Sequence, residues 1–584
     1  MKTLGASILF LATLAFSGGA LAQSPLLTRV TSGPVVTTPS GSRSCNWLDF
    51  DRDDFQDLLI TNGKQGGEDN MLYRNDRQGG FSLVADTVCH DGAPSDGATC
   101  ADYDNDGFID IYVSNWYGVD NLLYHNDMGG GFIRIDSGIV PNDAGYSETA
   151  AWGDADGDGL LDLYVANSDG NFRNFLYHNL GGGAFQKVSG IVPVTDQFRS
   201  RCVNWIDMDL DGDQDLFVTN EANQRNQLYR NDGYPTFTKI STGAIATSQF
   251  TSHSSSWGDY DNDGDFDVVV ANYNQAAQLF QNDGSGNFSL ISSPFGGDVG
   301  CSFSSAWADY DNDADLDLLI TNGYCTSFTH NFLYENQGNG AFVRNMTEPV
   351  AIDSGSSYGC AWGDYDNDGF LDLAIANWRN ETQPNYLYHN AGNANHWVEF
   401  KLEGTVSNRS AIGTIVSLQA IIQGDTVHQM REVTAQSGYC SQNSLVLHFG
   451  LADATNILQM NVTWPSGIEQ TFGNITANAL YSLQENGSIQ VVGIDPDKDG
   501  NMGLQVFPNP SDGRFTVRID ANPAGNLQCE VTDINGRLIQ SQQLASLGGT
   551  QEFSLAVDAP QGLYLLRVRD EDGHAAQRKI LIVD

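Results

Sequence analysis

Seven groups of four aspartates recur in this chain with a single spacing. The aspartates stand at positions 1, 3, 5 and 9 of a nine-residue loop, and successive groups begin 50 to 55 residues apart. The groups are Asp49, Asp51, Asp53 and Asp57; Asp102, Asp104, Asp106 and Asp110; Asp154, Asp156, Asp158 and Asp162; Asp207, Asp209, Asp211 and Asp215; Asp259, Asp261, Asp263 and Asp267; Asp309, Asp311, Asp313 and Asp317; and Asp364, Asp366, Asp368 and Asp372. Carboxylates this close repel one another by up to about 4 kcal/mol per close pair at an effective dielectric constant of 20. The spacing therefore predicts a cation in every loop.

Calcium is the cation that these loops are expected to hold. Carboxylate oxygens are hard ligands, and a flexible shell of many oxygens suits Ca²⁺ better than Mg²⁺, which demands octahedral geometry. Zinc is disfavoured because no histidine or cysteine lies inside any loop. Simple polar turns are disfavoured because a turn needs only one or two aspartates. We predict about seven calcium ions, with a structural role and no direct part in function.

The sixth position of each loop should turn sharply, as in the calcium loop of an EF-hand. Glycine, which reaches left-handed conformations without steric cost, occupies this position in five loops. These glycines are Gly107, Gly159, Gly212, Gly264 and Gly369. Loops one and six carry Asp54 and Ala314 there instead, so we expect these two loops to be the weakest sites.

Four short strands surround each loop in the predicted repeat. An apolar strand such as 58–61 follows the loop and ends at an asparagine, a second strand such as 121–126 comes next, and a glycine-rich turn leads to a strand that begins with phenylalanine. A last strand enters the next loop, with tryptophan two residues before the first aspartate in six repeats and Cys100 in the other. Four strands in about 50 residues, repeated seven times, are typical of a β-propeller with one four-stranded sheet per blade.

A closed ring is favoured over an open solenoid. The first and last repeats resemble the middle ones, whereas an open array needs polar caps at its ends. The seventh repeat ends after Asn390 without its fourth strand, while residues 26–30 are unmatched near the N-terminus. We predict that residues 26–30 complete the last blade and so close the ring.

The aspartate groups, their strands and the recurring Asn-x-Leu-Tyr sequences resemble FG-GAP repeats, also called VCBS repeats, which form the calcium-loop blades of integrin α-subunit propellers. The resemblance covers roughly residues 24–395. It implies a seven-bladed calcium-loaded propeller, here assigned to residues 23–394, that serves as an extracellular recognition scaffold and is sometimes borne by an enzyme.

Composition limits the partners and the compartment. The 584 residues should form several domains, and the net charge of -45 makes nucleic acid and anionic membranes poor partners. Residues 1–22 are typical of a secretory signal peptide, and no other stretch is apolar enough to span a bilayer. Nine cysteines permit disulfides in an exported protein. Cys89 with Cys100 and Cys301 with Cys325 are the nearest pairs, but spacing does not assign the connectivity.

The aspartate groups stop near residue 395, and a different module begins. Three sequences, at 407–413, 437–442 and 464–467, resemble in order those of the ASPIC/UnbV domain of the cartilage acidic protein family, which predicts a β-sandwich-like domain over 395–492. Arg409 and Arg431 could clamp an anionic ligand or neutralise acidic neighbours. Ser437, Ser441 and His448 lack a nucleophile elbow and an acid in register, so they predict no hydrolase.

The C-terminal part resembles a secretion signal domain. An acidic linker over 493–503 precedes residues 504–584, whose Phe-Pro-Asn-Pro, Gly-Arg-Phe, Asp-Ile-Asn-Gly and terminal Lys-Ile-Leu-Ile-Val sequences are similar to a type A sorting domain of the type IX secretion system. The resemblance implies a small Ig-like sandwich, the type IX machinery as a partner, passage through an outer membrane, and either removal of the domain or surface attachment. An ordinary Ig-like adhesion domain is the alternative.

Two functions remain open. The first, which we favour, is a monomeric secreted or surface-attached protein that recognises a protein or glycan through loops 63–69, 116–120, 273–275 and 378–384, which differ between repeats. The alternative is a polysaccharide lyase or hydrolase, which would need titratable groups in one pocket. His125, His178 and His389 share a repeat position that elsewhere holds Arg74, Arg230, Gln281 or Glu335, and Glu148, Glu221 and Glu381 show no partner in the sequence. No catalytic residue is therefore predicted.

Overall fold

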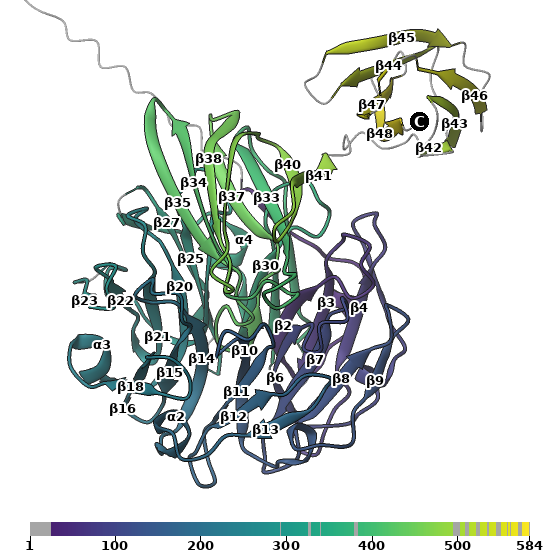
Figure 1. Ribbon diagram of the computed structural model, residues 1–584. Coiled ribbons are helices and arrows are strands. Elements are labelled where there is room, and N and C mark those ends of the chain that lie inside the picture. Colours follow the sequence, from purple (N-terminus) through teal and green to yellow (C-terminus); the bar gives the residue numbers. More distant parts are fainter. Residues whose placement is uncertain are drawn as a thin grey trace, which may run out of the picture.

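The computed structural model describes residues 25–494, except 293, 325–328, 339 and 379–382, together with eight segments of the C-terminal part. These segments are 503–507, 513–520, 526–533, 537–544, 551–557, 559–560, 562–569 and 575–582. The described chain is almost entirely β-structure, arranged as a large propeller, a sandwich seated on it, and a separate small C-terminal sandwich (Figure 1). None of its helices is long and apolar enough to cross a bilayer.

Antiparallel units of four strands, one per repeat, make up the propeller, and the fifth and sixth units are continuous in one eight-stranded sheet. The first three are β2 (Ser42–Leu48), β3 (Asp57–Asn62), β4 (Met71–Asn75) and β5 (Phe81–Leu83); β6 (Ser95–Ala101), β7 (Asp110–Asn115), β8 (Leu122–Asn126) and β9 (Phe132–Arg134); and β10 (Ser147–Gly153), β11 (Asp162–Asn167), β12 (Phe175–Asn179) and β13 (Phe185–Lys187). The next two are β14 (Ser200–Ile206), β15 (Asp215–Asn220), β17 (Gln227–Asn231) and β18 (Phe237–Ile240); and β20 (Ser252–Gly258), β21 (Asp267–Ala276), β22 (Gln278–Gln281) and β23 (Ser289–Leu290). The last two are β24 (Val299–Ala308), β25 (Asp317–Asn322), β27 (Phe332–Asn336) and β28 (Phe342–Asn345); and β30 (Ser357–Gly363), β31 (Asp372–Asn377), β32 (Tyr386–Asn390) and β1 (Leu27–Arg29).

Short elements connect these sheets. They are the single helical turns α1 (Pro34–Thr37), η1 (Thr87–Cys89), η2 (Val140–Asn142), α2 (Val192–Thr195), α3 (Ala244–Thr247) and α4 (Pro349–Ile352), and the strand pairs β16 (Gln224–Arg225) with β19 (Gln249–Phe250) and β26 (Thr329–His330) with β29 (Ser354–Gly355). The fifth and sixth sheets are also joined directly, because β21 runs on to pair with β24.

The N-terminal segment completes the last sheet, as predicted. Strand β1 pairs antiparallel with β32, with Leu27 opposite Asn390. The backbone amides of Leu26 and Leu27 donate to the two carboxylate oxygens of Glu348 at 2.8 and 2.9 Å. The last sheet therefore contains both ends of the propeller sequence.

One asparagine per repeat links each sheet to its neighbour. The side-chain amide at the end of the third strand donates to the carbonyl of the residue after the first loop aspartate of the preceding repeat, at 2.7 to 2.9 Å. The donors are Asn75, Asn126, Asn179, Asn231, Asn282, Asn336 and Asn390. Asn75 of the first repeat reaches Tyr365 of the seventh, so the links run around a closed ring. The all-β propeller prediction is confirmed.

Residues 396–494 form a β-sandwich on the propeller. One sheet contains β37 (Leu447–Ala452), β33 (His396–Glu403), β40 (Ala479–Gln484) and β41 (Ile489–Ile494); the other contains β35 (Asp425–Glu432), β34 (Ile415–Ile422), β38 (Asn456–Thr463) and β39 (Glu469–Thr476). Val398, Phe400, Leu418 and Met460 are buried between the sheets. The alternating strands of this region therefore give the predicted sandwich.

The C-terminal part forms a smaller sandwich. Its sheets are β42 (Gly503–Phe507), β43 (Arg514–Asp520) and β46 (Gln551–Ala556), and β45 (Leu538–Leu544), β44 (Leu527–Asp533), β47 (Gly562–Arg569) and β48 (Ala575–Ile582). Phe515, Val517, Leu566 and Ile580 are buried in its core. Most of the expected acidic linker, residues 495–502, lies outside the described residues.

Residues 435–444, which we call the plug, leave the sandwich and enter the centre of the propeller. Strand β36 (Ser441–Gln442) of the plug pairs in parallel with β2. The plug forms hydrogen bonds with the innermost strand of every propeller sheet, through Cys45, Thr99, Glu148, Asn204, Ser256, Ser304 and Trp362. The sequence at 437–442, which suggested the domain family, thus fixes the sandwich to the propeller axis.

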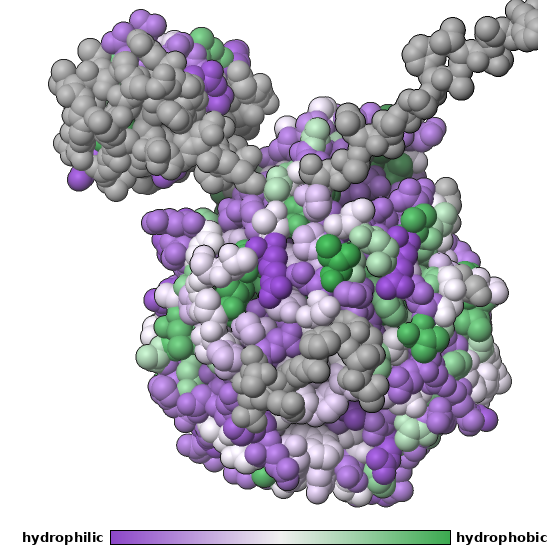
Figure 2. Space-filling model, turned by 180° about the vertical axis from the view of Figure 1, so that it is seen from behind, coloured by the Kyte–Doolittle hydropathy of each residue, from purple (hydrophilic) through white to green (hydrophobic). Residues whose placement is uncertain are grey.

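The face shown in Figure 2 is mostly hydrophilic, with hydrophobic residues scattered over it. Cys301 is disulfide-bonded, and Cys325 lies outside the described residues. Cys89 and Cys100 are buried free thiols, so the structure does not pair them.

Candidate functional site

The seven aspartate loops share one backbone geometry. The first aspartate accepts a hydrogen bond from the amide of the fifth residue at 2.9 to 3.2 Å in every loop. The ninth aspartate is buried and accepts from the backbone amide of the asparagine that ends the third strand, at 2.6 to 2.8 Å. The loop is therefore held at both ends, and its inner carboxylates are forced together.

Unpaired carboxylate oxygens lie inside these loops. In five loops one oxygen of the third-position aspartate is buried and has no hydrogen-bond partner among the described residues. These aspartates are Asp51, Asp104, Asp209, Asp261 and Asp366. In the first two loops, the aspartates at positions 1, 3 and 5 each offer an oxygen within 4.8 Å of the others. A buried carboxylate oxygen without a partner is costly, and a hard cation that accepts several oxygens removes the cost, so the donor set fits calcium.

Burial raises the pKa of many loop carboxyls. Burial raises the pKa of Asp102 and Asp154 to about 7, and that of Asp215 and Asp267 to about 9, although backbone amides oppose the rise. Neighbouring aspartates push these pKa values in the same direction as burial. The folded loops thus disfavour ionisation of their own carboxyl groups. A bound divalent cation would favour the ionised carboxylates again.

The sixth loop position is left-handed in all seven repeats, including Asp54 with φ 67° and Ala314 with φ 83°. The fourth position is left-handed as well, which the sequence reading missed. Four loops carry asparagine there, and its side chain donates to the sixth-position carbonyl of the next repeat at 2.9 to 3.1 Å. These are Asn105, Asn262, Asn312 and Asn367. The tolerance of asparagine for left-handed backbone was the available signal.

The three histidines that share one repeat position, His125, His178 and His389, contact the aspartate loops. His125 lies 3.3 Å from Asp104 and 3.3 Å from Asp110. His178 and His389 contact the ninth aspartates of their own loops at 3.1 and 3.2 Å. Hydrogen bonding to these carboxylates raises the pKa of His178 and His389. The three side chains support loop carboxylates, although none lies inside a loop sequence.

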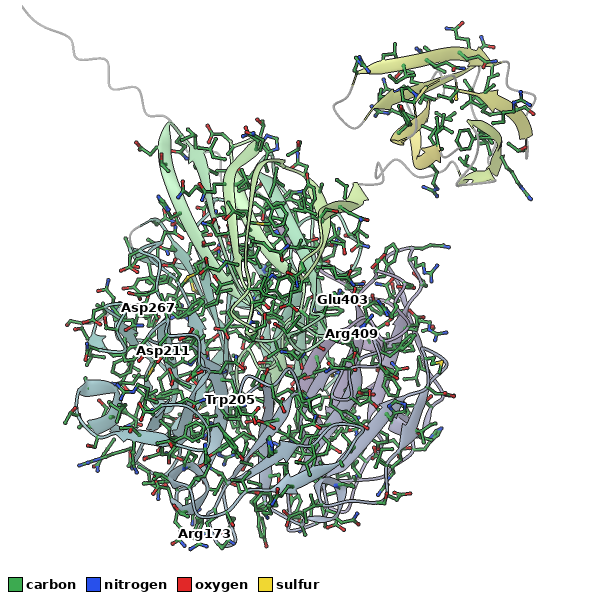
Figure 3. The ribbon with its side chains drawn as sticks, in the orientation of Figure 1. Arg173, Trp205, Asp211, Asp267, Glu403 and Arg409 are labelled. Atoms are coloured by element: carbon green, nitrogen blue, oxygen red, sulfur yellow. The ribbon has the colours of Figure 1, made fainter. Side chains whose placement is uncertain are left out.

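A cavity of about 480 Å³ opens at the other end of the propeller channel. Its lining residues stand near the starts of the innermost strands and near the ends of the second strands, whereas the aspartate loops join these two strands at their opposite ends. Figure 3 shows Glu403 and Arg409 where the sandwich meets the propeller, and Arg173 at the far end of the propeller. Arg173 lies in the connection between β11 and β12. The equivalent connection of the preceding repeat, between β7 and β8, carries Trp116, which lines the cavity. The cavity therefore opens at the end of the propeller that faces away from the sandwich.

Charged groups meet on one side of this cavity. Arg201 donates to Glu148 at 2.8 Å and to Glu221 at 2.6 Å. Tyr439, at the tip of the plug, donates to Glu148 at 2.7 Å. Burial raises the pKa of Glu148 to about 7, against the lowering effect of Arg201. Glu148 and Glu221 therefore share a partner that the sequence did not reveal, while Glu381 lies outside the described residues.

Aromatic side chains form the other side. Tyr273, Phe303, Tyr324 and Tyr358 line the cavity, and the rings of Phe303 and Tyr358 lie 4.2 Å apart between centroids. Trp378 stacks on Tyr324 at 4.6 Å with an interplanar angle of 24°. Gly63, Trp116 and Tyr273, which begin three of the four variable loops of the sequence, all line the cavity.

The sandwich residues singled out in the sequence have structural partners. Ser437 and Ser441 belong to the plug, where their hydrogen bonds hold it in the channel. His448 contacts the carbonyl of Gly369 at 3.2 Å, and burial lowers its pKa to about 4. Arg409 pairs with Glu403 at 2.7 Å. Arg431 is buried in the negative field of Asp309, Asp259 and Asp315. The structure thus favours neutralisation of acidic neighbours over an anion clamp.

Three family models match the chain. The FG-GAP-like repeat model matches residues 49–113, 102–165, 154–218, 207–270, 259–320 and 324–375, which together make up more than half of the chain. The chain belongs to the FG-GAP-like repeat family. The ASPIC and UnbV model matches residues 404–490, and the secretion system C-terminal sorting domain model matches residues 505–583. The sorting domain indicates secretion through the type IX system, with possible attachment to the outer surface.

Known proteins resemble the chain more distantly. Cartilage acidic protein 1 of Homo sapiens is 25% identical over 430 residues, 67% of this chain and 62% of that protein, and the Mus musculus protein is 26% identical over 438 residues, 68% and 64%. The match thus spans less than two thirds of these relatives. Among solved structures, the α-L-arabinanase of Penicillium chrysogenum is 13% identical, with a TM-score of 0.34 over 62% of this chain and 99% of that one. The Aleuria aurantia lectin is 12% identical, with a TM-score of 0.33 over 54% and 97%.

Proposed function

We propose that this protein is a secreted or surface-attached recognition protein, in which about seven calcium ions stiffen the propeller and the central cavity binds an extracellular protein or glycan. The calcium ligands are the 28 loop aspartates, and the buried oxygens without a hydrogen-bond partner at the third position of five loops support the assignment. Millimolar calcium outside cells would fill even weak sites of this kind.

One observation carries the assignment of the cavity. The residue six places before the first loop aspartate is the second residue of the innermost strand in six repeats and the fifth in the longer strand β24, and all seven of these residues line the cavity. They are Arg43, Asp96, Glu148, Arg201, His253, Phe303 and Tyr358. The metal positions repeat one residue type seven times, whereas this position holds six types. A scaffold that repeats while one converging ring varies is expected of a ligand site.

An enzyme is the second candidate, because three carboxylates meet in the cavity. Asp96, Glu148 and Glu221 line it, and a glutamic acid with a pKa near 7 suits general acid catalysis. However, Arg201, Ser168 and Tyr439 all hydrogen-bond to Glu148. A carboxylate held by three partners is suited to shaping a site, so recognition is favoured.

Binding and turnover assays on the mature protein test the proposal. Arrays of glycans and extracellular proteins would be probed with calcium and with a chelator, and polysaccharides would be incubated with the same samples. We expect binding in calcium, its loss after chelation, and no turnover. Trp116→Ala should weaken binding, whereas Leu180→Ala, an exposed site outside the cavity, should not. Release of sugar products by the wild type would replace recognition with the enzyme alternative.

A further inference from the structure

We propose that the central cavity takes a neutral saccharide residue, whose apolar face packs on the aromatic side and whose hydroxyl groups bind Asp96 and Arg43. This inference rests on the proposed function and names its ligand class. A volume of about 480 Å³ lies within the range that small-molecule sites occupy.

The two sides of the cavity come from different repeats. The aromatic residues Tyr273, Phe303, Tyr324 and Tyr358 belong to repeats five to seven. The charged residues of the opposite side belong to repeats one to four, and Trp116 and Tyr117 of repeat two also line the cavity. A sugar ring presents C–H groups on its faces and hydroxyl groups at its rim, so it matches a site with an aromatic wall facing a polar one.

Two buried polar atoms at the cavity are left without hydrogen bonds. Asp96 is only 7% exposed, and within the described part of the chain neither its Oδ1 nor Nε of Arg43 has a hydrogen-bond partner. The two atoms lie 3.6 Å apart, which is too far for a hydrogen bond between them. Both atoms have almost no solvent-accessible surface, so a ligand hydroxyl group reaches them by shifting these two side chains, and it then donates to the carboxylate oxygen and accepts from the guanidinium nitrogen. Water can do the same, but it gains nothing from the aromatic wall.

The charges of the cavity select against ionic ligands. Arg201 is already paired with Glu148 and Glu221, so an anionic ligand would face carboxylates whose counter-charge is occupied. Arg43 lies over the rings of Tyr358 and Trp378, at 4.6 and 5.0 Å from their centroids. A cationic ligand on this aromatic side would meet the guanidinium of Arg43, which lies over these two rings and not over Tyr273 or Tyr324. A neutral ligand avoids both conflicts.

Affinity measurements with sugars of different charge test the ligand class. Glycan arrays with neutral, uronic-acid and sulfated oligosaccharides, followed by calorimetry, would be run on the full calcium-loaded chain. We expect binding to neutral glycans only, with an affinity that does not change with salt. Tyr324→Ala and Asp96→Asn should each weaken binding about ten-fold or more.

Two matched variants control these substitutions. Asp136→Asn removes an exposed carboxylate, 79% exposed, outside the cavity, and Leu83→Ala removes an exposed apolar side chain; both should leave affinity unchanged. If Asp96→Asn fails to fold, Tyr324→Ala still decides, because Tyr324 is 47% exposed.

Each result has one meaning. Three results would overturn the inference and leave the recognition proposal standing. They are a preference for anionic glycans, binding of peptides alone, and sugar binding that both cavity variants leave intact. Failure of the calcium-loaded protein to bind any glycan or extracellular protein would overturn both.

Discussion

Loops one and six share the backbone feature that predicts weak calcium sites, but their surroundings are opposite. Both carry a residue other than glycine in left-handed conformation at position six. Around loop one, Lys401 of the sandwich lies 3.0 Å from Asp49 and 2.6 Å from Asp54, and Arg77 lies 2.6 Å from Asp53.

Around loop six the neighbours are mainly acidic. Asp315 and Glu335 add negative charge to the loop aspartates, and Arg431 is the cation that opposes them most clearly. Burial, followed by Asp313 and Asp311, raises the pKa of Asp309 well above its usual value. The comparison shows that backbone conformation gives the loop its shape, whereas neighbouring charge determines how much it needs a cation. We therefore expect loop six to depend strongly on calcium and loop one to depend on it least.

Removing calcium from the whole protein should give the largest effect. A ligand that binds only the folded state at 100 times its dissociation constant stabilises it by about 2.7 kcal/mol, and several sites add together. We expect chelation to lower the melting temperature in scanning calorimetry, and calcium but not magnesium to restore it. An unchanged melting temperature would contradict structural calcium at every loop.

The stabilisation by calcium should depend on pH. Folding raises the carboxyl pKa values above their unfolded values, to about 7 at Asp102 and about 9 at Asp215. In the chelated protein these groups favour folding at low pH, and this contribution is lost as pH rises through the folded-state pKa values. The difference in melting temperature between calcium-loaded and chelated protein should therefore widen from pH 6 to pH 9. A constant difference over this range would show that the loop carboxyls are ionised without metal.

Much of this architecture could be predicted from the sequence. The aspartate spacing and strand order gave the propeller, and the unmatched segment 26–30 gave its closure with β32. The plug could not be predicted, because its contacts join residues hundreds of positions apart, such as Glu148 and Tyr439. For the same reason the sequence did not reveal that Arg201 binds both Glu148 and Glu221, or that Lys401 lies against loop one. Local spacing defines loops and strands, but it does not show which loops another domain will cover.

Replacing Lys401 tests the difference between the loops directly. Lys401→Met should lower the free energy of unfolding in calcium-depleted buffer by about 1 kcal/mol, because the carboxylates of Asp49 and Asp54 lose their partner. Added calcium should recover most of this loss by taking over the neutralisation. Lys239→Met removes a comparable ion pair with Asp196, 2.6 Å long and distant from the loops, and its effect should not depend on calcium. Equal calcium dependence of the two variants, measured by urea unfolding, would remove the distinction between loop one and the rest.

Replacing the sixth loop residue with glycine should change stability least. The two possible replacements distinguish the effect of backbone strain from the effect of the neighbouring charge. Ala314→Gly relieves a left-handed alanine, a gain of about 1 kcal/mol that the greater freedom of glycine in the unfolded chain partly offsets. Asp54→Gly relieves a similar conformation but removes the contact with Lys401, so its net gain should be smaller or absent. Melting temperatures of the two variants in saturating calcium measure the difference. Equal stabilisation by both would mean that the contact with Lys401 contributes nothing, and the charge difference between the two loops would lose its support.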